Sequence, residues 1–278
     1  MEQRIELPQG NVQVYDEGEG PVLVFVHGLL VDHTLWELVV ERLSDRHRCV
    51  AIDLPLGAHR EAMRADADLT PPGIAAMVAG VMEALDLRDV VLVGNDTGGA
   101  ICQLVVASHP ERLAGLVLTT CDAYEHFPPP AVKPFTWLGN APRIGDALLR
   151  LGRFGPVRTA LIAPVNKRRS DERIRAWVEP GVTSADVRRD VLRFLAAIDA
   201  KYTVAAAPAL KAFGRPALVV WSEGDRVFPL KDGKRLAADL SAPLEVIDDT
   251  RTFIPLDQPE RLSELIAAFV AERVVVAA

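Results

Sequence analysis

Short apolar runs rich in β-branched residues recur along the chain and alternate with longer segments of helical periodicity. The runs show no polar alternation, which is typical of parallel strands that are buried on both faces. The longer segments repeat apolar residues at steps of three and four, as a helix with one buried face does. This order predicts an α/β protein with a mostly parallel central sheet and helices on both of its faces. Strands are expected at 22–26, 49–52, 90–93, 116–118 and 217–221, and helices at 72–85, 100–108 and 262–270.

The pattern changes at two places along the chain. Residues 4–7 and 12–15 alternate apolar and polar positions across a short turn, which predicts a hairpin at one edge of the sheet. Residues 127–208 contain no strand-like run, so we expect a helical cap inserted there into an α/β core made of residues 1–126 and 209–278. The helical candidates within the cap are 144–151, 171–178 and 184–200.

The composition is that of an ordinary globular protein and excludes disorder as the main state. The 278 residues are 49% apolar and 25% charged, and this length suits two domains or one large domain with an insertion. Thirty-one Lys and Arg against 38 Asp and Glu give a net charge of −7. Nucleic acids and anionic membrane surfaces both require a basic patch, so this balance predicts neither as a partner. The sequence instead predicts a small-molecule substrate for a monomer or a homodimer.

Cysteine usage and the N-terminal sequence predict a cytoplasmic protein. Cys49, Cys102 and Cys121 are too few and odd in number for a disulfide framework, which fits a reducing compartment. The N-terminus lacks the features of a signal peptide, and no apolar run approaches the roughly 18 residues of a membrane span. The chain also lacks nucleotide-binding glycine motifs and His/Cys clusters of metal-ligand spacing, so neither a cofactor nor a metal is expected.

The candidate chemistry is concentrated in residues 90–100, which read VVLVGNDTGGA. An apolar strand ends at Gly94, a glycine-rich turn follows, and a helix begins. This is the strand–turn–helix pattern G-x-nucleophile-x-G, with Asp96 in the place of the nucleophile. Glycines are needed because the central residue sits in a strained turn, and the helix N-terminus would stabilise an anion there. Alternatively, Asp96 merely caps the helix that follows it.

Three further segments occur in a characteristic order. A His-Gly turn at residues 27–30 follows the first buried strand, Asp225 lies in the loop after the strand at 217–221, and residues 246–260 follow another short strand. Together with the turn at Asp96, these segments resemble the α/β-hydrolase superfamily over essentially the whole chain. An aspartate at the nucleophile position resembles the haloalkane dehalogenase and epoxide hydrolase branch. The resemblance implies an α/β-hydrolase fold with a helical cap over the site.

The resemblance also implies roles for residues at these positions. Asp96 would attack an sp³ carbon that bears a halide or an epoxide oxygen, and would form an alkyl ester. The backbone N–H groups of Leu29 and Thr97 would form the oxyanion hole. Asp225 matches the acid that orients a catalytic histidine, and Asp122 stands where some relatives carry this acid instead. The implied substrate is a small or medium apolar organic molecule.

The histidine that the resemblance implies is absent from the sequence. Aligning Phe253 and residues 257–260 with the family pattern puts Thr252 where the histidine belongs, and no histidine occurs after His126. In the ester mechanism this histidine activates the water that releases the product, and threonine has no accessible pKa for that role. If nothing replaces the histidine, an alkyl ester on the enzyme would form and persist.

Other residues could complete the site. His126 and His59 come from loops at the carboxyl ends of strands, where the sites of open α/β sheets lie, so either is a candidate surrogate base. His27 begins the His-Gly turn and either buttresses this loop or transfers a proton. Aromatic residues could line the pocket, although cap helices also bury aromatic residues routinely. The aromatic candidates are Tyr124, Trp137 and Trp177.

Three functions stay open on the sequence alone. The first, which we favour, is an enzyme of the hydrolase superfamily with Asp96 as nucleophile and Thr252 in place of the usual histidine. The second is a non-hydrolytic lyase, isomerase or cyclase in which Asp96 moves a proton, with a second carboxyl group nearby. The third is a catalytically silent protein that keeps the fold and the pocket and only binds a ligand.

Overall fold

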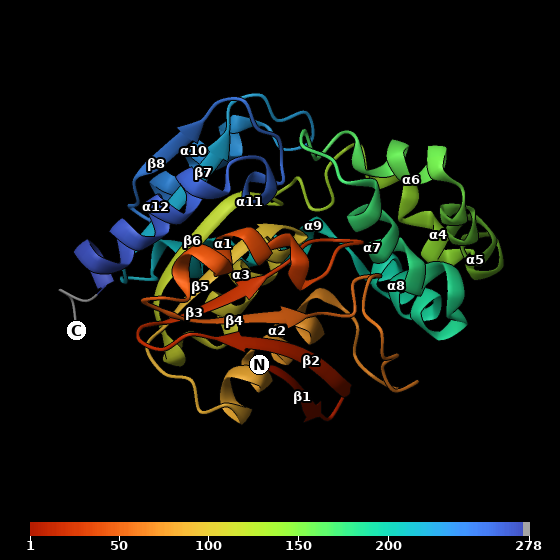
Figure 1. The fold of residues 1–278 in the computed structure, drawn as a ribbon, viewed down its shortest axis with the longest axis horizontal. Coiled ribbons are helices and arrows are strands. Elements are labelled where there is room, and N and C mark those ends of the chain that lie inside the picture. The colour runs from red at the N-terminus through yellow and green to blue at the C-terminus, as the bar shows by residue number, and fades with distance from the viewer. Residues whose placement is uncertain (275–278) are drawn as a thin grey trace.

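The computed structural model describes residues 1–274, which contain an eight-stranded sheet (Figure 1). The strands lie in the order β1-β2-β4-β3-β5-β6-β7-β8. Neighbouring strands run parallel from β4 through to β8, whereas β2 pairs antiparallel with both β1 and β4. The strands are β1 (Glu2–Leu7), β2 (Gly10–Glu17), β3 (Val22–Val26), β4 (Arg48–Asp53), β5 (Val90–Asp96), β6 (Leu113–Cys121), β7 (Ala217–Ser222) and β8 (Leu244–Ile247).

The sheet contains every strand that the sequence pattern predicts. The five apolar runs form β3 to β7, and the alternating N-terminal segment forms the β1–β2 hairpin. Strands β3, β5 and β6 are buried along nearly their whole length. Their lack of polar alternation follows from this burial, because both faces of the sheet are covered by helices.

Helices pack on both faces of the sheet. Buried side chains of α2, α3, α9 and α10 share one core with one face, and those of α1 and α12 share a second core with the other. The helices predicted at 72–85, 100–108 and 262–270 correspond to α2, α3 and α12. The helices around the sheet are α1 (Glu37–Leu43), α2 (Pro71–Ala84), α3 (Thr97–Ser108), α9 (Ala200–Lys211), α10 (Leu230–Asp239), α11 (Ile254–Asp257) and α12 (Pro259–Phe269).

Five further α-helices between β6 and β7 gather at one end of the molecule, on the right in Figure 1. Residues 127–208, all of which the structure describes, hold no strand, as the sequence pattern predicts. The α-helices are α4 (Trp137–Asn140), α5 (Pro142–Leu149), α6 (Gly155–Ile162), α7 (Asp171–Thr183) and α8 (Ala185–Ala197). Single turns of other helix types are η1 (His33–Leu35), η2 (Pro110–Arg112), η3 (Lys133–Phe135), η4 (Arg150–Arg153) and η5 (Val270–Val274).

The helix predicted at 184–200 forms α8, which ends three residues earlier than predicted. α8 ends at Ala197, and the Asp199 carboxylate then caps α9 by accepting a hydrogen bond from the Lys201 N–H over 2.8 Å. α9 packs against α3 in the layer that covers the sheet. The division of the chain into core and cap at 127 and 208 stays a prediction. Within residues 1–274, every helix is too short or too polar to cross a membrane.

Candidate active site

Asp96 occupies a sharp turn between β5 and α3. Its φ of 55° and ψ of −133° lie where residues with a side chain are rarely found. Two glycines make this turn sterically possible. A Cβ at Gly94 would lie 2.8 Å from Gly99 Cα, and a Cβ at Gly98 would lie 2.5 Å from the carbonyl oxygen of His27. The strained backbone therefore places the Asp96 carboxyl between the loop after β3 and the N-terminus of α3.

The loop after β3 approaches the Asp96 carboxyl closely. The Leu29 N–H donates a hydrogen bond to Asp96 Oδ2 over 3.0 Å. A Cβ at Gly28 would lie 2.5 Å from Asp96 Cβ and 2.6 Å from Asp96 Cγ, so only glycine allows this approach. The backbone N–H groups of Leu29 and Thr97 both lower the pKa of Asp96. The two groups that the sequence assigns to an oxyanion hole thus meet at one carboxylate.

The partly buried Asp96 and the fully buried Asp122 interact through their charges. Burial raises the pKa of Asp96 to about 7, against the two N–H groups that lower it. Asp122 Oδ2 accepts a hydrogen bond from Thr97 Oγ1 over 3.1 Å, and Asp122 Oδ1 has no partner within the described residues. Burial, reinforced by the charge of Asp96, raises the pKa of Asp122 well above its ordinary value. A protonated Asp122 avoids the cost of a second buried charge beside Asp96.

Asp225 and Thr252 meet in the loops that follow β7 and β8. Thr252 Oγ1 donates a hydrogen bond to Asp225 Oδ2 over 2.6 Å. Asp225 Oδ1 accepts from the N–H groups of Val227 and Phe228 at 2.7 and 2.5 Å. Burial is the main cause of a raised pKa at Asp225. The carboxyl therefore holds the Thr252 hydroxyl in one orientation, as the family resemblance would have it hold a histidine.

Asn95 joins the Asp225–Thr252 pair to the Asp96 turn. Its buried Nδ2 donates to the carbonyl oxygen of Thr252 over 2.7 Å and to Thr119 Oγ1 over 3.0 Å. Asn95 could not be predicted as part of the site, because the elbow motif leaves its position unspecified. The available signal was an amide side chain at the end of an apolar run.

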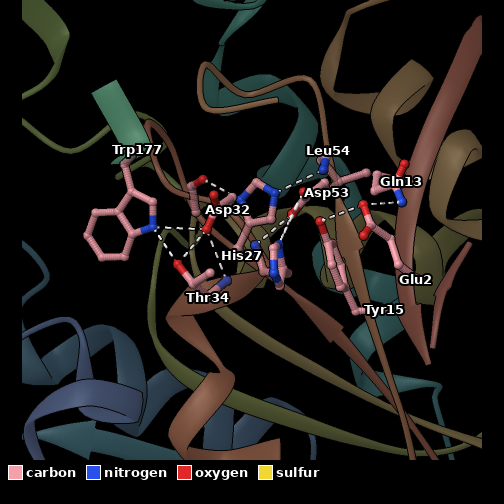
Figure 2. Close-up of polar contacts among 11 residues, drawn as sticks. Glu2, Gln13, Tyr15, His27, Asp32, Thr34, Asp53, Leu54 and Trp177 are labelled. Atoms are coloured by element: carbon pink, nitrogen blue, oxygen red, sulfur yellow. Dashed lines mark hydrogen bonds and ion pairs between the residues drawn. The ribbon is translucent and has the colours of Figure 1, made fainter. Parts of the chain in front are cut away.

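Both nitrogens of the buried His27 ring bind backbone groups. The Leu54 N–H donates to His27 Nε2 over 2.9 Å, which leaves Nδ1 to donate to the Gly28 carbonyl oxygen at 2.8 Å. Figure 2 shows the ring linked to Leu54, just after β4. Burial lowers the pKa of His27. Of its two possible roles, this geometry favours buttressing the loop after β3.

The structure places the candidate surrogate bases against other carboxylates. His59 Nε2 lies 3.4 Å from Asp190 Oδ2 on α8, and His126 Nδ1 lies 2.6 Å from Asp232 Oδ2 on α10. Within residues 1–274, neither ring makes a hydrogen bond to Asp96. The histidines therefore do not complete a nucleophile–base pair in this arrangement.

Trp177 is the aromatic candidate that contacts the neighbour of Thr252 in the chain. Its buried Nε1 donates to Asp32 Oδ1 over 2.9 Å and to Thr34 Oγ1 over 2.7 Å, as Figure 2 shows. Its ring meets the Phe253 ring edge-on, with 6.0 Å between the centroids. Since Phe253 follows Thr252, Trp177 packs α7 against the loop that carries the threonine.

The other two aromatic candidates lie elsewhere. Trp137 is 49% exposed on α4, so it is a surface residue rather than a buried lining. The Tyr124 hydroxyl donates to Asp239 Oδ2 over 2.9 Å, and the Arg235 guanidinium lies 3.6 Å from the centroid of its ring. Tyr124 is therefore directed toward α10. The pocket roles of Trp137 and Tyr124 stay predictions.

The site can supply a carboxylate nucleophile or a proton carrier. In the described part of the chain, no group of three or more His, Cys, Asp or Glu side chains could hold a metal ion. Asp96, Asp122 and Asp225 thus stand as three carboxyls of raised pKa that differ in their hydrogen bonds. Active sites commonly use groups whose pKa values are shifted by burial and by a neighbouring charge.

Comparisons with known proteins agree on the architecture. A family described as alpha/beta hydrolase fold matches residues 21–259. The "Uncharacterized hydrolase YugF" of Bacillus subtilis is 28% identical over 92% of this chain and 93% of its own length. Haloalkane dehalogenase 2 of Mycobacterium bovis is 27% identical over 95% of this chain and 92% of its own length. The crystal structure of haloalkane dehalogenase DbeA from Bradyrhizobium elkani has a TM-score of 0.83 at 17% identity. The match covers 100% of this chain and 99% of that one, and at this identity it shows a shared fold only.

Proposed function

Because the chain belongs to the alpha/beta hydrolase fold family, we propose that it is an enzyme whose Asp96 carboxylate attacks an electrophilic carbon of a small or medium apolar molecule. The fold class and the membership of a hydrolase superfamily, both predicted from the sequence, are confirmed by the family match and the named relatives. The observation that carries the proposal is the hydrogen bond from the Leu29 N–H to Asp96 Oδ2, at a residue held in a strained turn.

An alkyl halide suits this site best. One Asp96 oxygen forms a bond to the carbon while the carbon–halogen bond breaks and the halide leaves with the electron pair. Oδ2 becomes the carbonyl oxygen of the ester and keeps its hydrogen bond from Leu29. A halide leaves as a stable anion, whereas an epoxide oxygen needs a proton donor. The relative in Mycobacterium bovis is named a haloalkane dehalogenase, which supports the same substrate class.

The release of product is the step for which this site is poorly equipped. Hydrolysis of the ester requires a base for the attacking water, and Thr252, held by Asp225, offers only a hydroxyl. His59 and His126 bind other carboxylates. We therefore expect the alkyl ester on Asp96 to accumulate as one adduct for each enzyme molecule.

Intact-protein mass spectrometry after incubation with a panel of alkyl halides and epoxides tests the proposal. The expected result is a stable mass increase that peptide mapping localises to Asp96. Asp96→Asn is the matched control, because asparagine tolerates a positive φ and keeps the size of the side chain while removing the nucleophile. An equal adduct on the control would mean that another residue is alkylated, and would contradict the proposal. Neither adduct nor product with any reagent would also contradict it, and would favour a silent ligand-binding protein.

The rate of adduct formation is expected to rise with pH through neutrality. Only the ionised carboxylate is nucleophilic, and burial raises the pKa of Asp96 to about 7. Below that pH the ionised fraction, and with it the alkylation rate, falls about tenfold for each pH unit. Time courses of adduct mass from acid to alkaline pH measure the profile. A rate that stays level down to pH values near 4 would mean that Asp96 titrates like an ordinary exposed aspartate.

The same raised pKa supports a second candidate function, which is proton transfer. A carboxyl with a pKa of about 7 beside Asp122, whose pKa burial also raises, can accept and donate protons near neutrality. Such an enzyme would be a lyase, isomerase or cyclase. Turnover in heavy-oxygen water distinguishes the two candidates, because proton transfer forms product without solvent oxygen and leaves no adduct on Asp96.

A further inference from the structure

The net charge of the whole chain conceals a strongly basic segment. Residues 133–175 hold ten Lys and Arg against three Asp and Glu, a net charge of +7 in a chain whose total is −7. The segment runs from η3 through α4, α5, η4 and α6 into α7. The prediction that the protein has no anionic partner rests on the total charge. It therefore does not apply to this end of the molecule.

The same segment exposes large apolar side chains. Within residues 1–274, seven of the ten exposed large apolar side chains fall between 135 and 161. Helices α4, α5 and α6, which carry most of them, lie at the end of the molecule away from the sheet (Figure 1). Single exposed apolar residues are ordinary, but such a concentration marks an interaction surface. The seven are Phe135, Trp137, Ile144, Leu148, Leu151, Phe154 and Leu161.

A basic hollow opens within this surface. It has a volume of about 300 Å³ and is lined by Arg153, Arg158 and Arg175, with Glu179 as the one acidic residue of the lining. In the described part of the chain, neither Arg153 nor Arg175 lies within ion-pair distance of a carboxylate, although both are exposed. The Arg153 guanidinium lies 4.7 Å from the centroid of the exposed Phe154 ring. Glu179 forms no ion pair with these arginines within the described residues, and unpaired guanidinium groups around a hollow suit a phosphate.

We propose that this surface, residues 133–175, docks on an anionic lipid bilayer and that the arginine hollow receives a lipid phosphate. Arginines among exposed aromatic and aliphatic side chains are the combination that binds at the headgroup boundary, where apolar groups enter the acyl region and cations meet anionic lipids. A free phosphate would use the arginines but would leave the seven apolar side chains in water. The proposal is independent of the reaction proposed for Asp96.

A second copy of the chain fits this surface less well than a bilayer. The common symmetric dimer places the same patch of both subunits face to face. Such a dimer would bring two segments of net charge +7 together, and like charges in contact oppose association. An anionic bilayer complements both the charge and the apolar side chains.

Vesicle sedimentation with the full chain tests the proposal. Binding to vesicles of phosphatidylcholine mixed with phosphatidylglycerol is expected to be at least about tenfold stronger than binding to phosphatidylcholine alone, and to be lost at high salt. Equal binding to both vesicles, or binding to neither, overturns the proposal.

Substitutions within residues 133–175 test whether this surface is the part of the protein that binds the vesicles. Arg153→Glu and Arg175→Glu should each weaken binding to the mixed vesicles about fivefold or more, since each basic residue near the surface contributes about that factor. Ile144→Ser should also weaken binding to the mixed vesicles, because it removes an apolar side chain that would enter the acyl region. Arg88→Glu and Val246→Ser, exposed positions outside the segment, serve as matched controls and should bind as the wild type does. Wild-type binding by the segment variants, or a dimer that Arg153→Glu dissociates, overturns the proposal in favour of another partner.

Discussion

Replacing Thr252 with histidine is expected to convert a single alkylation of Asp96 into repeated turnover. Thr252 Oγ1 donates to Asp225 Oδ2 over 2.6 Å, so a histidine at this position would have an acid ready to accept its Nδ1–H. The Asn95 amide fixes the Thr252 backbone to the Asp96 turn, which directs the new ring toward the ester. General base catalysis contributes about 100-fold to 10⁴-fold. Thr252→His should therefore release product at least about 100-fold faster than the wild type.

Quenched-flow analysis of product release, combined with the adduct mass at steady state, measures this change. Thr252→Asn is the matched control, because its amide can donate to Asp225 as a histidine would but has no basic nitrogen. Because Thr252 is fully buried, thermal unfolding must show that Thr252→His folds. A folded Thr252→His protein that accumulates the adduct as the wild type does would show that Thr252 does not occupy the position of a base.

The site could be predicted from the sequence where short-range steric rules determine it. The glycines around Asp96 and the His-Gly turn before Leu29 are local patterns that permit only a few backbone conformations. Asp225 and Thr252 lie far apart in the sequence, yet each lies at a fixed distance from a strand end, and the parallel sheet brings those ends together. The structure accordingly joins the residues that these motifs identify.

The histidine and aromatic roles could not be predicted, because each depends on a distant partner. Nothing near His59 in the sequence indicates that Asp190 on α8 will face it, and His126 meets Asp232 in the same way. Tyr124 follows a buried strand as a pocket residue would, but its hydroxyl donates to Asp239 on α10. Helix α4 was not predicted because four residues are too few to display a helical period.

Gly28→Ala is expected to abolish alkylation of Asp96 while the fold persists. The new Cβ would lie 2.5 Å from Asp96 Cβ and 2.6 Å from Asp96 Cγ, and closer still to Oδ2, so the carboxyl must move away from the Leu29 N–H. The φ of Gly28 is not in the left-handed region, so alanine strains the packing and not the backbone. Misplacement of a reacting group by about 1 Å can cost about 100-fold in rate, and overpacking costs about 1–3 kcal/mol of stability.

Adduct mass against time, with thermal unfolding of the same samples, measures both effects of the Gly28 substitution. Gly224→Ala is the matched control, since the same added methyl group would lie 3.7 Å from the Thr250 carbonyl oxygen, an ordinary contact. It should form the adduct at the wild-type rate. If Gly28→Ala also alkylates at that rate, the hydrogen bond from Leu29 to Asp96 contributes nothing to the reaction. The nucleophile would then act without the anion-binding loop that Leu29 provides.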